Sequence, residues 1–357
     1  MKMAKTCLKF LTGNGKTMDK QLLIHTATTL LAGSKGLLAM DESTGTCNKR
    51  FAAFGIPQTE TFRRDWRELI ATTPGLGKYI SGAILFDETI HQKKMDGLLI
   101  VNALADAGII PGIKVDTGAK AMAGFAGEKI TEGLDGLRER LDGYYKLGAR
   151  FAKWRAVIAI DKGMPTRACI EANASALARY AALCQEAGLV PVVEPEVLME
   201  GTHDLQVCLT VTEEVVRAVF NHLYLQGILL EGLIVKPNMI TPGLNCPQQA
   251  TVNEVADASI LCLRRCVPAA VAGIAFLSGG QAGELASAHL NAMHDRHGPT
   301  LPWSLTFSFA RAIQQPALQI WHGELKNKSA AQQALYHRAK CNDAARQGEY
   351  KATMEQA

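Results

Sequence analysis

The sequence predicts an α/β protein that folds as a single (β/α)8 barrel, the architecture known as the TIM barrel. Eight short apolar segments recur along the 357 residues. Their spacing of about 30 to 45 residues is the length of one strand, one helix and the connecting loops. Segments with helical periodicity lie between them, and strands that alternate with helices indicate a parallel sheet. Eight such units fit a closed barrel better than an open doubly wound sheet.

Each predicted strand is a short apolar run that ends at a polar residue or a turn, as buried parallel strands do. The eight runs lie at residues 37–41, 82–87, 112–116, 150–155, 190–194, 233–236, 273–278 and 303–309. No Gly-x-Gly-x-x-Gly motif follows the first run, which argues against a dinucleotide-binding sheet.

Four helices have clear signals in the second half of the chain, at residues 172–185, 212–225, 252–265 and 285–293. The first ends near Gly188, and glycine is typical just after a helix. The second is expected to open at Thr212, followed by Glu213 and Glu214, because the helix dipole favours acids in the first turn.

The composition excludes several classes of protein. A hydrophobic content of 48% with 20% charged residues is typical of a globular domain with an ample core. The net charge of +4 is small and the basic residues are spread, so we expect no nucleic-acid partner. No apolar stretch approaches the roughly 18 residues of a membrane span, so we expect no membrane partner. The nine cysteines lack Cys-x-x-Cys spacing, which favours free thiols in a reducing compartment such as the cytoplasm.

Three parts of the chain are expected. Residues 1–20 carry five lysines and one acid, and we predict a disordered or processed segment there. The barrel domain is predicted over residues 21–350, and a short tail over 351–357. A remnant of an organelle-targeting segment is the alternative for residues 1–20, and it would place the protein in the plastid stroma.

Lysines and carboxylates gather where the predicted strands end, and a barrel carries its chemistry at this end of its strands. Lys236 closes one apolar run, where burial would favour the neutral amine and make it a nucleophile. The alternative is a lysine that extends from a strand end to solvent. Residues two apart on a strand face the same side. The residues expected to surround the mouth are Asp41, Lys114, Asp116, Lys153, Arg155, Glu194, Glu196, Lys236 and Ser278.

The positive charges of several lysines in one mouth repel each other, and this repulsion lowers the pKa of at least one of the lysines. Neighbouring carboxylates supply acid and base groups. A lysine nucleophile beside carboxylates forms an imine with a carbonyl substrate, which permits carbon–carbon cleavage through an enamine. This chemistry predicts a Schiff-base aldolase or a near relative, with no cofactor and no metal. A structural network of ion pairs is the alternative.

Two anion sites are predicted next to this mouth. Ser278, Gly279 and Gly280 follow the seventh strand and lead into a helix, an arrangement that favours phosphate. Arg311 follows the eighth strand, where it could clamp the same phosphate, and Ser308 is expected to join this site. The residues after the first strand predict a second site with Ser43, Thr46 and Arg50.

The sequence resembles the class I fructose-1,6-bisphosphate aldolases. Its motif sequences are most similar to those of the plastid-type and related bacterial branch. The segments that carry the resemblance stand in family order and span nearly the whole chain. They are LLAMDESTGTCNKR, GIKVD, ARFAKWR, VPVVEPE, IVKPNMITPG, FLSGGQ and SLTFSFARA.

The resemblance implies reversible cleavage of fructose 1,6-bisphosphate to dihydroxyacetone phosphate and glyceraldehyde 3-phosphate, in glycolysis and gluconeogenesis, by a homotetramer. Lys236 would form the imine, Glu194 with Glu196 beside it would dehydrate the carbinolamine, and Asp41 would take the C4 hydroxyl proton. Lys153 and Lys114 would position groups and balance charge. The ketose-side phosphate would lie on Ser278, Gly279 and Arg311, and the aldehyde side on Ser43, Arg50 and Arg155.

Three alternatives stay open at this point. A metal-dependent aldolase would need a ligand set, but His289, His294 and His297 do not share a helix face, and we interpret them as a solvated helix end. The other two are a transaldolase-like enzyme for another sugar phosphate and an aldolase-like scaffold protein. Family members commonly end in a tyrosine that assists proton exchange at the enamine. Because the sequence ends at Ala357 without one, we expect that exchange to be slow.

Overall fold

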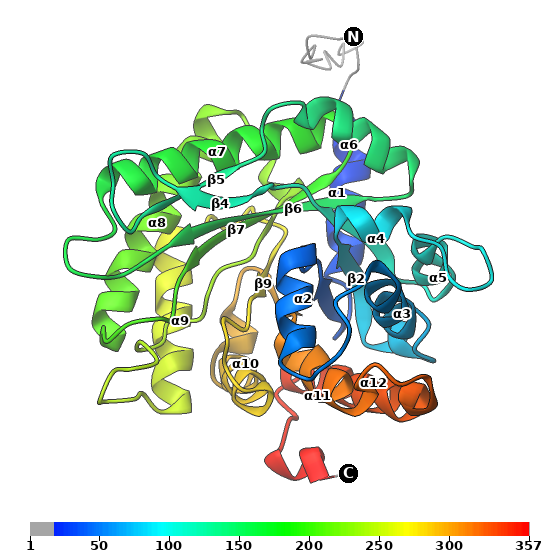
Figure 1. The fold of residues 1–357 in the computed structure, drawn as a ribbon. Helices are drawn as coiled ribbons and strands as arrows, with labels where there is room; N and C mark the ends of the chain where they lie inside the picture. Colours follow the sequence, from blue (N-terminus) through cyan, green and yellow to red (C-terminus); the bar gives the residue numbers. More distant parts are fainter. Residues whose placement is uncertain (1–17, 357) are drawn as a thin grey trace, which may run out of the picture.

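The computed structural model describes residues 18–356, and it shows a closed barrel of eight parallel strands surrounded by helices (Figure 1). The strand order around the barrel is β1-β10-β9-β8-β7-β6-β3-β2. Pairing of Leu37 with Ser308 and of Leu38 with Phe309 joins the last strand to the first and closes the barrel. The predicted fold is therefore confirmed. The barrel strands are β1 (Gly36–Met40), β2 (Ile80–Leu85), β3 (Ile110–Lys114), β6 (Phe151–Ile158), β7 (Val190–Val197), β8 (Ile234–Val235), β9 (Gly273–Phe276) and β10 (Ser304–Phe309).

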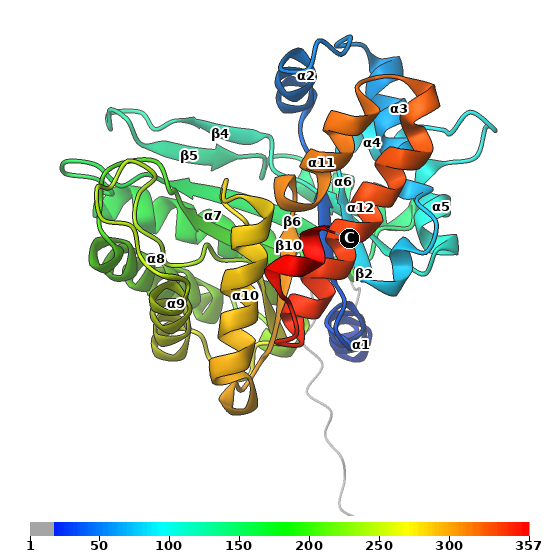
Figure 2. The ribbon, with the colours of Figure 1, turned by 90° about the horizontal axis from the view of Figure 1, so that it is seen from below.

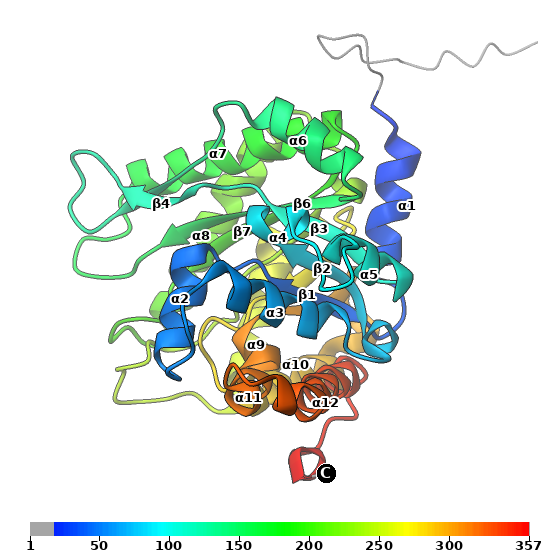
Figure 3. The same cartoon turned by 45° about the vertical axis from the view of Figure 1, so that its right-hand side comes forward.

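The helices surround the barrel, as Figures 2 and 3 show from two further directions. They are α1 (Lys20–Leu30), α2 (Thr44–Ala52), α3 (Glu60–Ala71), α4 (Asp87–His91), α5 (Ile100–Asp106), α6 (Leu137–Lys146), α7 (Arg167–Glu186), α8 (Leu205–Leu225), α9 (Val252–Cys266), α10 (Gly283–His297), α11 (Arg311–Trp321) and α12 (Lys328–Arg346).

The predicted start of α8 at Thr212 is wrong. The helix begins at Leu205, where the Asp204 side chain accepts a hydrogen bond of 2.8 Å from the backbone N–H of Val207. Thr212 instead lies buried inside the helix and accepts a hydrogen bond of 3.3 Å from Asn238. The predicted role of Gly188 fits the structure, since it follows α7 with a φ of +79°.

A small antiparallel hairpin, β4 (Gly118–Ala121) with β5 (Lys129–Glu132), was not predicted from the sequence. It lies between β3 and β6 in the chain and forms a sheet separate from the barrel (Figure 2). The hydroxyl of Thr131 donates to the backbone carbonyl of Arg155 at 2.8 Å. The hairpin is therefore fastened to the strand that carries Lys153 and Arg155.

Helix α1 closes one end of the barrel. Its buried side chains Leu23, Ala27 and Leu30 share a core cluster with inward-facing strand residues such as Phe151 and Ile234. In Figures 2 and 3, α1 and α2 lie on opposite sides of the molecule, and α2 follows the carboxyl end of β1. The end of the barrel that α1 covers with apolar side chains is therefore the end away from α2.

Close packing under the mouth depends on glycine. A Cβ added at Gly112 would lie 2.3 Å from the ring of Phe151, and one at Gly36 would lie 2.5 Å from the ring of Phe307. Because such distances are far below van der Waals contact, larger residues at these strand positions would displace an aromatic ring from the core.

The sequence also led to predictions about the first residues, the cysteines and membrane spans. The segment predicted to precede the domain lies outside the described residues, apart from residues 18–20. The eight cysteines within the described range are free thiols. None of the helices over residues 18–356 combines the length and the apolar character that crossing a bilayer requires.

Candidate active site

A cavity of about 960 Å³ opens at the carboxyl ends of the barrel strands. It is lined by charged and polar side chains from β3, β6 and β7, from the residues after β1, β8 and β9, and from α2 and α11. The structure brings all the predicted site residues except Ser308 to its wall: Asp41, Ser43, Thr46, Arg50, Lys114, Asp116, Lys153, Arg155, Glu194, Glu196, Lys236, Ser278, Gly279, Gly280 and Arg311.

Two lysines and two carboxylates form a buried network at the centre of this cavity. Lys153 Nζ lies 2.9 Å from Asp41 Oδ2 and 2.7 Å from Glu194 Oε2. Lys236 Nζ lies 3.0 Å from Glu194 Oε1. Glu194 therefore bridges the two ammonium groups, and each of these four residues is less than one-tenth exposed.

The strands place these groups by simple alternation. Lys153 and Arg155 lie two residues apart on β6, and Glu194 and Glu196 do so on β7, so each pair faces the same side of its strand. Lys236 immediately follows the two-residue strand β8, and its backbone N–H donates to Val193 at 2.8 Å. This bond holds Lys236 at the level of Glu194.

The two central lysines differ in basicity. Burial lowers the pKa of Lys236, and repulsion from Lys153 lowers it further, although Glu194 and Asp41 oppose the shift. Burial also disfavours the Lys153 ammonium, but attraction to Asp41, Glu194 and Asp116 outweighs it and raises the pKa of Lys153. Lys236 is therefore the lysine that can supply a neutral amine, while Lys153 stays charged.

The two central carboxylates are held in the ionised form. Burial alone would raise their pKa values, but the neighbouring lysines prevail and lower the pKa of both Asp41 and Glu194. For Asp41 the strongest of these charges is Lys153, followed by Lys236. The network thus contains two cationic and two anionic groups, and the lysines keep both carboxylates ionised despite burial.

A second layer of charges surrounds the network. Lys114 Nζ lies 3.5 Å from Asp116, whose pKa is raised because burial outweighs the attraction of Lys114. Asp116 also accepts backbone N–H bonds from Gly118 and Arg155. The Arg155 guanidinium pairs with Glu196, and despite burial this ion pair raises the pKa of Arg155.

One predicted anion site lies between β9 and α11. Ser278 is buried, and Gly279 and Gly280 adopt positive φ values of +58° and +99°, which glycine tolerates best. A Cβ at Gly280 would lie 2.9 Å from Nη2 of Arg311, so the arginine lies directly against this turn. Glycine there allows backbone and guanidinium donors to converge on one anion.

The other predicted anion site lies at the start of α2. The Ser43 hydroxyl caps the helix by accepting from the Thr46 N–H, and the two hydroxyls lie 3.1 Å apart. Arg50 is ion-paired with Glu42, which was not singled out from the sequence. Glu42 also binds Arg67 of α3 at 2.6 Å, so it fixes one edge of the Arg50 guanidinium. Arg67 is 25 residues from Glu42 in the chain, and no local motif signals this pairing.

Ser308 and the three histidines of α10 lie elsewhere than the sequence suggested. Ser308 is buried on β10 with no hydrogen-bond partner for its hydroxyl, and it is not part of the cavity wall. His289 is not solvated as expected: it is buried on α10 and bonds Gln281 at 2.6 Å. His294 bonds the Leu305 carbonyl and His297 bonds Asp257, so the three rings have three different partners.

A family model described as fructose-bisphosphate aldolase class-I matches residues 22–357. The chain belongs to this family. It is accordingly a fructose-bisphosphate aldolase, a carbon–carbon lyase.

Similar proteins come from bacteria, plants and apicomplexan parasites. A probable fructose-bisphosphate aldolase class 1 of Xanthomonas campestris is 56% identical over 94% of this chain and 100% of that protein. A cytosolic fructose-bisphosphate aldolase of Arabidopsis thaliana is 49% identical over 93% of this chain and 84% of that protein. The solved structure of the Plasmodium falciparum aldolase, in complex with TRAP and an inhibitor, has a TM-score of 0.91 at 47% identity. The match covers 93% of this chain and 96% of the Plasmodium falciparum chain.

Proposed function

We propose that Lys236 is the residue of this aldolase that forms the imine with the ketose. The observation that carries the proposal is the contact of 3.0 Å between its Nζ and Glu194, in a buried network that lowers the pKa of Lys236. Lys153 lies in the same network but is held charged by two carboxylates, so it is a poor nucleophile.

The first steps use only Lys236 and Glu194. Glu194 takes a proton from the Lys236 ammonium, and the neutral amine attacks C2 of fructose 1,6-bisphosphate to form a carbinolamine. Protonated Glu194 then returns its proton to the C2 hydroxyl, which leaves as water when the iminium forms. Glu194 ends as it began, and the positive charge has moved from the ammonium to the iminium.

Carbon–carbon cleavage requires a base at the C4 hydroxyl, and we assign this role to Asp41. Its carboxylate takes the hydroxyl proton while the electrons of the C3–C4 bond move into the iminium, giving an enamine and glyceraldehyde 3-phosphate. The Lys153 ammonium, 2.9 Å away, keeps Asp41 ionised before this step. Lys114 adds a more distant positive charge, and Glu196 holds Arg155 in place.

We assign the two phosphates to the two anion sites of the cavity wall, one after β1 and the other after β9 and β10. Ser278, Gly279, Gly280 and Arg311 would hold the ketose-side phosphate. On the aldehyde side the donors would be Ser43, Thr46, Arg50 and Arg155. Two separate anion sites favour a bisphosphate over a sugar with one phosphate, which a transaldolase-like enzyme would take.

Borohydride trapping tests the assignment of Lys236. Wild-type protein treated with dihydroxyacetone phosphate and borohydride should carry one reduced adduct on the peptide that contains Lys236. Lys236→Ala should abolish both the adduct and cleavage while leaving the fold intact. The matched control is Lys129→Met, which removes an exposed lysine from the rim of the same cavity and should leave trapping unchanged. An adduct on Lys153, or an unchanged adduct in Lys236→Ala, would refute the assignment.

We also infer a homotetramer and a cytoplasmic location for this aldolase. The family resemblance supports the first, and the printed name of the Arabidopsis relative supports the second. Light scattering should give four times the chain mass. Import of the full chain into plastids, with removal of its first residues, would instead favour the stroma.

A further inference from the structure

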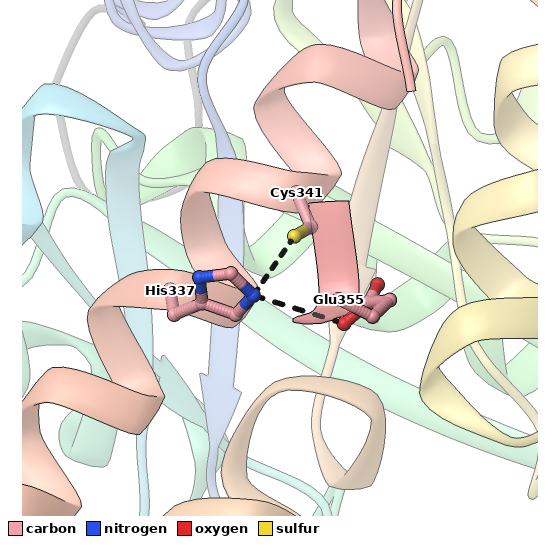
Figure 4. A group of neighbouring side chains, drawn as sticks. All are labelled: His337, Cys341 and Glu355. Atoms are coloured by element: carbon pink, nitrogen blue, oxygen red, sulfur yellow. Dashed lines mark hydrogen bonds and ion pairs between the residues drawn. The ribbon is translucent and has the colours of Figure 1, made fainter. Parts of the chain in front are cut away.

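A second cluster of chemically reactive side chains lies outside the catalytic cavity, where the end of the chain returns to α12. Figure 4 shows His337 and Cys341 on α12 and Glu355 on the short 3-10 helix Ala352–Gln356, with their side chains pointing toward one another. His337 Nε2 lies 3.6 Å from Cys341 Sγ and 3.9 Å from Glu355 Oε2. Among residues 18–356, these three offer ligand atoms that all lie within 4.8 Å of one another.

The spacing of the two helical residues suits a shared ligand. His337 and Cys341 are four positions apart, so α12 presents both on the same face, one turn above the other. Pairs of ligands at this spacing on a helix occur in zinc sites. Neither residue lines the catalytic cavity, so the mechanism proposed above does not explain why they lie together.

The separation of the nitrogen and sulfur ligand atoms matches the size of a zinc ion. Zinc bonds of about 2.3 Å to sulfur and about 2.0 Å to nitrogen, at a tetrahedral angle, place those two ligand atoms about 3.5 Å apart. The observed separation of Nε2 and Sγ is 3.6 Å. For two ligands at about 2.0 Å the expected separation is about 3.3 Å. Glu355 Oε2, at 3.9 Å from Nε2, needs to approach by only about half an ångström.

The carboxylate of Glu355 is oriented by a second set of contacts. Its Oε1 is ion-paired with Arg338 and accepts a hydrogen bond of 2.9 Å from the Tyr350 hydroxyl. Arg338 is itself buried and fixed by bonds to the Ala312 carbonyl at 3.1 Å and to Ser287 at 2.8 Å. These partners engage Oε1 and leave Oε2 facing the histidine. Outer contacts of this kind orient ligands in metal sites.

We propose that His337, Cys341 and Glu355 form a zinc site that fastens the segment after Tyr350 to α12. The three side chains supply nitrogen, sulfur and oxygen, a ligand set that suits Zn²⁺, and water would occupy the fourth position. A thiolate and a carboxylate together neutralise the two charges of the ion. The thiol proton leaves when the metal binds, because thiolate is the form that coordinates.

The competing interpretation is a cluster of ordinary hydrogen bonds. In that case Cys341 only contacts the His337 ring, and the Arg338–Glu355 ion pair alone holds the end of the chain. The two interpretations differ in what a metal does. Only a zinc site binds one equivalent of metal through three particular side chains and thereby restricts the segment that carries Glu355.

Metal binding is tested on the full chain after chelation and dialysis. Wild-type protein should take up one Zn²⁺ per chain, and with Co²⁺ it should show thiolate-to-cobalt charge-transfer absorption in the near ultraviolet. Cys341→Ser and Glu355→Gln should each lose stoichiometric binding. Cys246→Ser is the matched control, because Cys246 is a free cysteine remote in sequence from the cluster and should not affect uptake.

Protection from trypsin provides a readout that does not depend on activity. Lys351 is exposed just before the 3-10 helix, so trypsin should release the residues after it from the metal-free protein. Zinc should slow that cleavage at least tenfold in wild-type protein and not in Glu355→Gln, and the mass of the chain reports it directly. Absence of stoichiometric binding would overturn the proposal, as would equal binding in Cys341→Ser. Binding that survives in Glu355→Gln with unchanged protection would show that the tail is not a ligand, which overturns it as well.

Discussion

Removing the Lys153 ammonium should destabilise the protein in a way that depends on pH. Lys153 contacts Asp41 and Glu194 at 2.9 and 2.7 Å, and its side chain is only 5% exposed. In Lys153→Met, Glu194 keeps Lys236 as a partner, but Asp41 loses its nearest cation. Breaking a buried ion pair from one side typically costs about 3–5 kcal/mol, and we expect a loss of that size in the free energy of unfolding at neutral pH.

The pH dependence of this stability loss follows from the direction in which the pKa of Asp41 is shifted. In the wild type the pKa of Asp41 is below its ordinary value of 3.8, so Asp41 contributes stability above that pH and loses it in stronger acid. Without Lys153, the strongest of the charges that oppose burial is gone and only Lys236 and Lys114 remain, so the pKa of Asp41 rises. The variant then gains relative stability once Asp41 is protonated, so the difference between wild type and variant should narrow as the pH falls toward 4.

Urea titrations at neutral and at mildly acidic pH measure both effects. Lys129→Met serves as the control, because Lys129 is exposed at the same mouth and should cost little. Adding Asp41→Asn to Lys153→Met removes the unpaired charge and should restore part of the stability. If Lys153→Met is no less stable than the control, or if the difference does not narrow in acid, the central network is not held together by charge as described.

Two further predictions concern catalysis. Arg311→Ala removes a guanidinium that lies against Gly280. Because hydrogen bonds to charged groups contribute about 1.5–3 kcal/mol, kcat/KM for fructose 1,6-bisphosphate should fall roughly ten- to a hundredfold or somewhat more. An unchanged kcat/KM would show that Arg311 is not part of the phosphate site. Cleavage should persist after exhaustive treatment with EDTA, because the iminium supplies the electrophilic activation and the proposed zinc ligands do not line the catalytic cavity. Loss of cleavage that a divalent ion restores would contradict the imine mechanism.

The barrel was predictable because each strand carries its own signal. A run such as Leu37 to Met40 is apolar on both faces and ends at Asp41, which is what a strand buried between helices and barrel interior requires. The β4–β5 hairpin has no such signal. Its strands are four residues each, and most of their side chains are exposed or half-buried.

The start of α8 shows why a local signal can mislead. Thr212, Glu213 and Glu214 look like the first turn of a helix, but they lie inside one, because Thr212 is buried against Asn238 and Glu213 pairs with Arg217 and Arg265. These partners come from other turns and other elements. A single stretch of sequence does not contain that information.

The candidate site was predictable as a set of residues but not as a network. The rule that strand ends form the barrel mouth was enough to nominate Lys153, Glu194 and Lys236. It does not tell which carboxylate bridges two lysines, nor which lysine has the lowered pKa, because both depend on distances across neighbouring strands. Glu42 was overlooked for the same reason, since its partner Arg67 comes from α3.

Helix α1 also limits the access of solvent to the charged groups at the mouth. Because Leu23, Ala27 and Leu30 fill the opposite end of the barrel, the four central groups have an apolar floor, and solvent reaches them from one side only. Lys153, Lys236, Asp41 and Glu194 carry no net charge together, and passing a proton from Lys236 to Glu194 leaves that sum unchanged. The reaction proposed here would therefore begin by moving a proton inside the barrel. It would draw no proton from solvent and would leave no uncompensated charge above the apolar floor.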